Sequence, residues 1–388
     1  MRLLVRLAGW SGLLAMAAGL SITASAATDV VGHVYVDDNT AGTNTIGAFD
    51  RHSDGSLTPG AGSPFVAGGS GTGAALGSQG SLQPAGDGRY LLAADAGSNQ
   101  VSVLRVKRDG SLSANGRPVS SGGIRPISIA VHEDLVYVAN GGDPTTGAGS
   151  NYTGFTLQDD GHLVSLPGST VQLPANANPG DILFNSTGNN LIGIEVGTTV
   201  ASTFLIDSFT VDEDGRLTRA AGSPFAAQAA GPFGSEFSPT NPHHLYVSNA
   251  HGGAGNGSVS AFKVSSRGKL SSIGGSPYPD GQTAPCWVEI SRDGRYLFTV
   301  NTASTTISSY GILADGSLSH VSDTAFKSGV GIRPFDARLD PTGRWLYVVD
   351  AATATVSGFA VSGGSLTELA QSPFALPAGA TPFGIVAN

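Results

Sequence analysis

The chain has 388 residues, of which 56 are Gly, and only 13% of its side chains are charged. With 20 basic and 29 acidic side chains its formal net charge is −9, so its surface repels nucleic acid and anionic lipid. We therefore expect no nucleic-acid partner. The single cysteine, Cys286, excludes an intramolecular disulfide, so stability must come from a packed core.

The first 26 residues have the pattern of an export signal. Arg2 and Arg6 are followed by an apolar stretch over residues 13–22 and by the small residues Ala-Ser-Ala at 24–26. The stretch is short for a membrane span, so we predict cleavage and no membrane insertion of the mature chain. A retained N-terminal anchor is the alternative. Cleavage leaves 18 basic and 29 acidic side chains, a net charge of −11, on a secreted or periplasmic protein.

A short phrase, usually Asp-Gly-x-Leu, recurs seven times along the chain. Its glycines are Gly55, Gly110, Gly161, Gly215, Gly268, Gly316 and Gly364. The steps between them run from 48 to 55 residues. A period near fifty residues with strand-forming sequence is typical of a β-propeller with one blade per repeat. The sequence therefore predicts an all-β, seven-bladed propeller over residues 30–388.

A second phrase is an apolar run that ends in a polar residue, as in residues 136–140 (Val-Tyr-Val-Ala-Asn) and 245–249 (Leu-Tyr-Val-Ser-Asn). Such runs of β-branched and aromatic residues between turn signals predict strands. Each repeat adds a preceding strand that often opens on Pro, an alternating stretch, and a short strand after the Asp-Gly turn. We therefore expect four antiparallel strands in each blade, named A to D from the hub outward.

The two ends of the chain predict how the ring closes. The first repeat starts on a B strand at residues 33–37, and the last residues, 382–386, read as an A strand with nothing after it. Pairing these strands would remove two exposed edges, so deletion of the last eight residues should destabilise the ring. A recurrent Ser-Pro-[Phe/Tyr], first seen at residues 63–65, should place an aromatic ring between neighbouring blades.

The start of strand A and the end of strand B lie on the same rim, so polar residues gather around one mouth of the axial channel. We predict substrate contacts from the residues that end four B strands: Asn140, Asn249, Asn301 and Asp350. The alternative is that they cap strand ends and satisfy turn amides. Glu195 ends another B strand, and Arg125 and Arg333 precede the Pro that opens an A strand. Either Arg could instead brace a neighbouring loop.

Carboxylate and amide oxygens around a channel mouth are ligands that suit Ca²⁺. However, the chain has no Asp-x-Asp-x-Asp loop, and its histidines lack zinc spacing with any cysteine pair. We predict no cofactor, with a divalent cation such as Ca²⁺ as the alternative.

These repeats resemble the seven-bladed propeller lactonase family, which includes bacterial propeller 6-phosphogluconolactonases and fungal carboxymuconate-lactonizing enzymes. The Tyr-Val-x-Asn phrase is also similar to the repeats of secreted YVTN propellers. The resemblance covers residues 30–388 and implies a small-molecule lactone or carbohydrate as partner. We expect a monomer.

The resemblance also implies site residues. In the family one B strand ends Asn-Glu-Leu, with its Glu near the presumed active site, and Glu195 falls at that place. The chain departs from the family at residues 178–181, where Asn-Pro-Gly-Asp replaces Gly-Pro-Arg-His, and at 249–250, where Asn-Ala replaces Asn-Arg. The catalytic candidates are then Glu195 or His251 as the base and Arg125 or Arg333 as the oxyanion partner.

Two functions follow from this reading. The first is an exported lactonase-like propeller, a carboxylic ester hydrolase that opens a small sugar lactone or ester at the channel mouth. The second is a non-catalytic binding or scaffold propeller that recognises a glycan, peptide or envelope partner. An enzyme should show a closed pocket in which a base and a cation face one point. A binding module should show an open, flat rim with exposed aromatic side chains.

Overall fold

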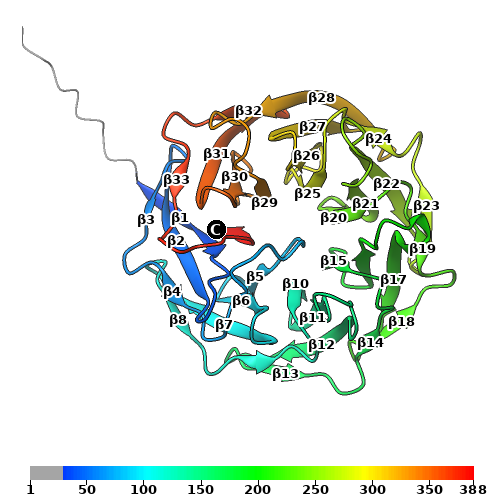
Figure 1. Ribbon diagram of the computed structural model, residues 1–388, viewed down its shortest axis with the longest axis horizontal. Helices are drawn as coiled ribbons and strands as arrows, with labels where there is room; N and C mark the ends of the chain where they lie inside the picture. The colour runs from blue at the N-terminus through cyan, green and yellow to red at the C-terminus, as the bar shows by residue number, and fades with distance from the viewer. Residues whose placement is uncertain (1–28) are drawn as a thin grey trace, which may run out of the picture.

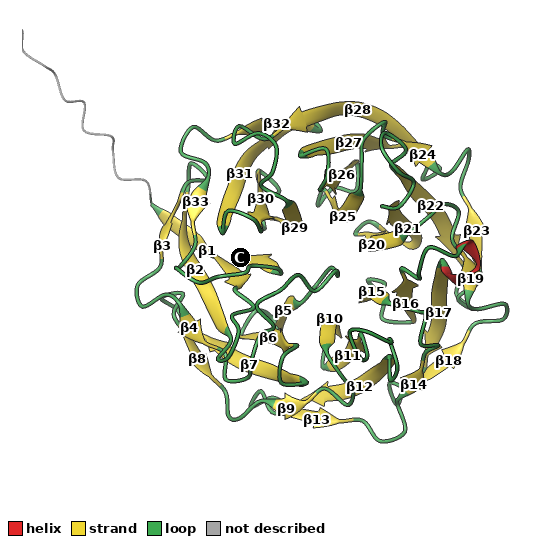
Figure 2. Cartoon of the chain, in the orientation of Figure 1, coloured by secondary structure: helices red, strands yellow, loops and turns green. Residues whose placement is uncertain are grey.

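The computed structural model describes residues 29–388, so the predicted export signal at 1–26 lies outside the described residues. Seven antiparallel sheets surround a central axis, which confirms the predicted seven-bladed propeller (Figure 1). The described part of the chain has one helix, the short 3-10 helix η1 (Ala201–Thr203), at the edge of the ring (Figure 2). The A–B and C–D turns form the lower rim of the ring, and the starts of the A strands form the upper rim.

The first three blades are built as follows, from the hub outward. Blade 1 contains β34 (Ile385–Ala387), β1 (Val30–Asp37), β2 (Thr45–His52) and β3 (Leu57–Pro59), with β4 (Phe65–Val66) paired to β2. Blade 2 contains β5 (Leu82–Ala85), β6 (Tyr90–Asp95), β7 (Gln100–Val106) and β8 (Leu112–Ala114), with β9 (Val119–Ser120) on β7. Blade 3 contains β10 (Pro126–His132), β11 (Leu135–Asn140), β12 (Asn151–Leu157) and β13 (Leu163–Ser165), with β14 (Val171–Gln172) on β12.

The other four blades repeat this plan. Blade 4 contains β15 (Pro179–Phe184), β16 (Asn190–Glu195), β17 (Leu205–Val211) and β18 (Leu217–Arg219), with β19 (Phe225–Ala226) on β17. Blade 5 contains β20 (Pro232–Ser238), β21 (Asn241–Asn249), β22 (Ser258–Val264) and β23 (Leu270–Ser272), with β24 (Tyr278–Pro279) on β22. Blade 6 contains β25 (Pro285–Ile290), β26 (Tyr296–Asn301), β27 (Thr306–Ile312) and β28 (Leu318–Ala325). Blade 7 contains β29 (Pro334–Leu339), β30 (Trp345–Asp350), β31 (Thr355–Ser362) and β32 (Ser365–Glu368), with β33 (Phe374–Ala375) on β31.

The ring closes through its two ends, as predicted. β34 pairs antiparallel with β1, so that Tyr35 lies opposite Val386. Next to this seam the Arg51 guanidinium donates to the Asn388 carbonyl oxygen from Nε and Nη2, at 3.0 and 2.8 Å. Arg51 Nη1 also lies 3.2 Å from the buried Asp340 carboxylate of blade 7. One arginine therefore joins the first blade, the last blade and the closing strand.

The two repeated phrases bind each other across the blade interfaces. The Tyr35 hydroxyl donates to the backbone carbonyl of Gly110, in the Asp-Gly turn of the next blade, at 2.9 Å. Three further tyrosines repeat this contact at 2.9–3.0 Å, with the pairs Tyr137–Gly215, Tyr246–Gly316 and Tyr347–Gly55. A Cβ on Gly110 would lie 2.1 Å from the His33 ring, and its φ of +76° also favours glycine. At four of the seven blade interfaces the two phrases are therefore joined by the same hydrogen bond.

Six of the seven sheets carry a fifth strand of two residues that the sequence did not predict. In four of them this strand begins at the aromatic residue of Ser-Pro-[Phe/Tyr], and the Ser hydroxyl accepts from a backbone N–H of strand C. Ser63 Oγ, for example, accepts from Ala48 N at 2.8 Å. Phe65 packs against a cluster that contains Tyr35 of blade 1 and Leu91 of blade 2. The motif therefore seals the gap between blades while pairing with its own sheet.

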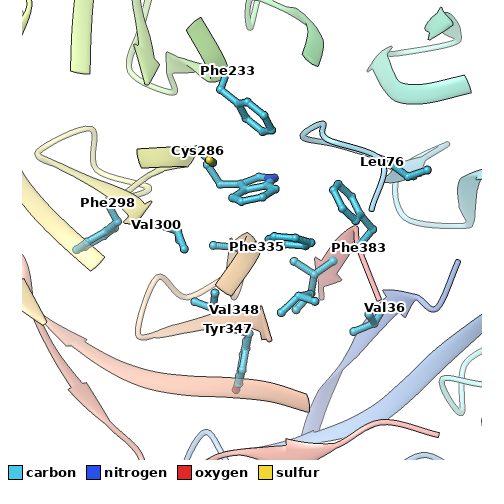
Figure 3. Packing of buried hydrophobic residues seen from close by; sticks show 14 of the residues in the cluster. Val36, Leu76, Phe233, Cys286, Phe298, Val300, Phe335, Tyr347, Val348 and Phe383 are labelled. Carbon is cyan, nitrogen blue, oxygen red and sulfur yellow. The ribbon is translucent and has the colours of Figure 1, made fainter. Parts of the chain in front are cut away.

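Aromatic rings fill the upper half of the axial channel (Figure 3). The Trp287 ring centroid lies 4.8 Å from that of Phe335 and 5.2 Å from that of Phe233, and Phe335 lies 5.0 Å from Phe383. These rings come from four blades and stand one or two residues after the Pro that opens each A strand. We call them the aromatic plug.

Residues 76–81, which lead into β5, lie within the hub beside this plug, and we call them the central segment. Trp287 Nε1 donates to the Ser78 carbonyl at 2.9 Å, and Gln79 N donates to the Gly180 carbonyl at 2.8 Å. Further hydrogen bonds of the central segment reach Ile127, Ser235, Val288 and Asp336. A connection between blades 1 and 2 thus contacts the innermost strands of five other blades, and the upper channel is closed.

Candidate functional site

The four predicted substrate contacts lie inside their blades. Asn140, Asn249, Asn301 and Asp350 are each at most 1% exposed. Asn140 Nδ2 donates to Asn151 Oδ1 at 2.9 Å, and the other three contact Ser or Thr hydroxyls of strand C in their own blade. These contacts hold each side chain inside its own blade at the end of strand B, and a substrate contact from these four residues stays a prediction.

Glu195 lies between blades 3 and 4. It is 2% exposed at the end of β16, and its carboxyl group is hydrogen-bonded to Asp207 of β17. The Tyr152 hydroxyl of blade 3 donates to Asp207 Oδ2 at 3.3 Å, and Arg219 forms an ion pair with Asp207 Oδ1. Burial and the Asp207 carboxylate raise the pKa of Glu195 to about 8, against the opposing effect of Arg219. Glu195 is thus part of a buried carboxyl pair.

The other three catalytic candidates stand on the upper rim, each on a different blade. Arg125 donates to the carbonyl oxygens of Gly141 and Gly142, both at 3.3 Å, and so braces the loop at 141–150. It lines an upper-rim cavity of about 360 Å³ together with Asp143. Arg333 is exposed and lies 5.4 Å above the Phe335 ring. His251 is also exposed. The charged groups that act on the Glu195 carboxyl are Asp207 and Arg219, so the four candidates do not form one constellation.

A second cavity lies on the axis below the central segment. It has a volume of about 160 Å³, and its polar lining comes from Gln79, Gln83, Asp181, Ser235, Glu236 and Arg338. Glu236 and Arg338 are half-buried, as is Leu183 beside them, so the cavity opens toward the lower rim. We call it the lower axial cavity.

Three charged side chains line this cavity, Asp181, Glu236 and Arg338, and Glu289 and Asp336 lie near Arg338. Arg338 Nη1 lies 3.3 Å from Glu289 Oε2, and the Arg338 side chain is 22% exposed whereas that of Glu289 is 4% exposed. Burial lowers the pKa of Arg338, but Glu289, Asp336, Glu236 and Asp181 more than offset this effect. Burial raises the pKa of Asp181 to about 7 and that of Asp336 to about 6. The site therefore combines one guanidinium with four carboxyl groups.

Most of these carboxyl oxygens accept hydrogen bonds from backbone N–H groups of the hub. The innermost strand of each blade is a sheet edge, whose outward N–H groups need acceptors. Asp181 Oδ2 accepts from Ser235 N at 2.9 Å, and Glu289 Oε1 accepts from Leu339 N at 2.9 Å. Asp336 Oδ2 accepts from Gly80 N at 3.3 Å. Each carboxylate therefore joins its own blade to another element of the hub.

Glu236 differs from the other three carboxylates. It accepts a hydrogen bond from the Ile290 backbone N–H, but its buried Oε2 atom has no partner among residues 29–388. Burial and Glu289 raise the pKa of Glu236 well above its ordinary value, against the effect of Arg338. Glu236, which has one buried oxygen without a partner among the described residues, thus lines the same cavity as the Arg338 guanidinium.

The sequence analysis missed Glu236, Glu289 and Arg338. A signal was present, because each is the fourth residue after the Pro that opens its A strand, at 232, 285 and 334. The three equivalent positions in consecutive blades share one level of the channel. Their charge in an innermost strand could have indicated an axial polar site.

No group of three or more His, Cys, Asp or Glu side chains among residues 29–388 could hold a metal ion. No helix in the same range is long and apolar enough to cross a membrane.

Comparison with protein families gives one match. Residues 194–384 match the family model described as "Lactonase, 7-bladed beta-propeller", which confirms the resemblance stated from the repeats. No curated protein sequence matches the chain significantly.

Several solved structures share the fold over nearly the whole chain. A candidate 6-phosphogluconolactonase from Bacteroides uniformis has a TM-score of 0.73 at 18% identity, covering 93% of this chain and 100% of that one. The periplasmic gluconolactonase of Pseudomonas aeruginosa has a TM-score of 0.71 at 18% identity, covering 92% and 98%. A candidate 6-phosphogluconolactonase from Bacteroides fragilis has a TM-score of 0.69 at 19% identity, covering 94% and 99%.

Proposed function

We propose that this protein is an exported lactone hydrolase that opens a small, neutral sugar lactone or related ester. The observation that carries the proposal is the lower axial cavity, whose lining includes the Arg338 guanidinium and Glu236, a carboxyl group with one oxygen that has no partner among residues 29–388. Lactone hydrolysis needs a base that activates water and a cation that stabilises the oxyanion. The family-model match over residues 194–384, which include Glu236 and Arg338, supports this reaction class.

The binding-module alternative has less support. No Phe, Tyr or Trp side chain between residues 29 and 388 is exposed. A flat recognition rim usually presents such side chains, because aromatic rings contribute much of the binding energy at protein surfaces. The rim of this ring presents mainly glycine-rich loops and charged turns.

Export rests on the N-terminal pattern of residues 1–26, and one structural neighbour is a periplasmic gluconolactonase. A sugar phosphate lactone is a cytosolic intermediate, so an unphosphorylated lactone is the better substrate for an exported enzyme. We propose a secreted or periplasmic monomer that needs no metal, nucleic acid or membrane insertion.

The test is hydrolysis of a panel of aldonolactones by the purified mature chain, followed by acid release with a pH indicator. We expect turnover of neutral lactones above the spontaneous rate, unchanged by a chelator. Loss of turnover with chelator would add a metal to the site. A folded sample with no turnover on any lactone would overturn the proposed function.

A further inference from the structure

We propose that the lower axial cavity is the substrate site, that it takes a small uncharged hydroxylated lactone from the lower rim, and that Glu236 is its base. This inference rests on the proposed function and deepens it. It moves the chemistry from the upper mouth, where Glu195, His251, Arg125 and Arg333 were expected, to the opposite end of the axis.

The choice of Glu236 follows from its contacts. Asp181 accepts hydrogen bonds on both oxygens, from Ser235 and Ser128 among others, and Glu289 is occupied by Leu339 N and Arg338. Asp336 is held by Ala337 N and Gly80 N. Only Glu236 among these four carboxylates keeps an oxygen without a partner among the described residues, and its Oε1–Ile290 contact fixes the side chain. Glu236 Oε2 is therefore the atom that can accept a proton.

The reaction balances with these groups alone. Ionised Glu236 takes a proton from a water molecule as the hydroxide oxygen adds to the lactone carbonyl carbon. The tetrahedral oxyanion is stabilised by the Arg338 guanidinium, which lines the same cavity. Collapse breaks the ring C–O bond, and the leaving alkoxide takes the proton from Glu236. The products are a hydroxy acid and the regenerated carboxylate.

Size and charge limit the substrate. A volume of about 160 Å³ is below the ~300–1,000 Å³ of pockets for drug-sized ligands, so it suits a single five- or six-membered ring. The one guanidinium of the site is already paired with Glu289 at 3.3 Å, so a buried phosphate or carboxylate substituent would lose its hydration without an unpaired cation to compensate. The hydroxyl groups of an uncharged sugar lactone can instead donate to Gln79, Gln83 and the carboxylates.

The direction of entry follows from the upper channel. Trp287, Phe335, Phe383 and Phe233 fill it, and the central segment is hydrogen-bonded to five blades. The half-buried Leu183 and Arg338 lie at the lower end of the innermost strands. Substrate therefore enters between the A–B turns.

Glu236→Gln tests this assignment, because the amide keeps an acceptor for Ile290 N and cannot take a proton. We expect kcat/KM on neutral lactones to fall by about 10²–10⁴, the usual contribution of a general base, mainly through kcat. Asp280→Asn is the matched control. Asp280 is also a buried carboxyl group with a raised pKa and an unpartnered oxygen, but it lies outside the cavity. Its turnover should stay within twofold of wild type.

Binding of an aldonolactam, a neutral and non-hydrolysable analogue, separates the site from the reaction. Calorimetry should show binding to the wild-type chain, weakened at least tenfold in Glu236→Gln, and none for the 6-phosphorylated analogue. Circular dichroism confirms that each variant is folded. Wild-type turnover retained in Glu236→Gln would overturn the site and leave the function standing. Glu236-dependent lactam binding without wild-type turnover would overturn hydrolysis and support the site. Neither turnover nor binding would overturn both.

Discussion

The upper and lower halves of the axial channel are built from the same seven innermost strands but filled in opposite ways. One or two residues after the opening Pro, the side chains are Phe233, Trp287, Phe335 and Phe383, which pack on one another. At the fourth residue the side chains include Glu236 and Arg338, which line a cavity of about 160 Å³, and Glu289, which pairs with Arg338. The same strand therefore supplies stability at one level and a polar site two or three residues further along.

The largest expected effect is removal of the central ring of the plug. Trp287→Ala should lower the free energy of unfolding by about 3–5 kcal/mol, because it leaves a cavity and removes the Nε1 donor to Ser78. Urea unfolding measures this loss. Trp345→Ala is the control, since Trp345 is only half-buried and lies at the start of β30. An equal loss in both variants would show that the plug is not a special source of stability.

The second effect is a dependence of stability on pH, which we expect from the carboxyl groups of the lower half of the channel and not from the aromatic plug. Burial raises the pKa of Asp181 to about 7 and that of Asp336 to about 6, so the folded state favours their protonated forms. The stability that they contribute is complete below pH ~4 and is lost as the pH rises toward ~7. We expect a lower Tm at pH 8 than at pH 5, measured by calorimetry.

Two variants sharpen this pH comparison. Asp336→Asn removes a titrating group from the lower half and should reduce the difference in Tm between pH 5 and pH 8. Trp287→Ala changes only the apolar half, so it should lower Tm at both pH values and keep the difference. Glu195, with a pKa raised to about 8, contributes in the same direction from the interface of blades 3 and 4. A higher Tm at pH 8 would contradict the burial of these carboxyl groups.

The smallest effect belongs to Arg333. Its guanidinium lies 5.4 Å above the Phe335 ring at the solvent side of the plug. Arg333→Ala should lower stability by about 0.5–1 kcal/mol and leave lactone turnover unchanged, because the cation–π contact is exposed. A strong loss of turnover with normal stability would return the site to the upper mouth.

The fold could be predicted because its signals are local and repeated. Tyr137 and Gly215 each belong to a short phrase that recurs, and their contact across a blade interface explains both recurrences. Ring closure could be predicted because one end of the chain lacks the strand that the other end has in surplus. The fifth strands were missed, since two residues such as Phe65 and Val66 carry too little pattern to be recognised.

The site was harder to predict because its residues come from different blades and meet only in the assembled ring. The central segment is rich in Gly and Ser and reads as a linker, yet Gln79 contacts strands of blades 4, 5 and 6. Glu236 lies in an unremarkable strand, and its partners Ile290 and Arg338 come from the next two blades. Glu195 stood out by its length, but burial beside Asp207 gave it a partner within its own sheet. Such contacts depend on the assembled ring.

The pairing of β1 with β34 also determines when blade 1 can be completed during synthesis of the chain. Blade 1 is the first to be synthesised, yet its innermost strand, β34, is the last element of the chain. Until β34 has been synthesised, the inner edge of β1 therefore has no strand to pair with. Each of the later blades has all its strands before that point. Phe383 of the aromatic plug and Asn388, whose carbonyl oxygen accepts from Arg51, belong to the same last segment and are synthesised together with β34. The hub, and with it the lower axial cavity, can be completed only after β34 has been synthesised.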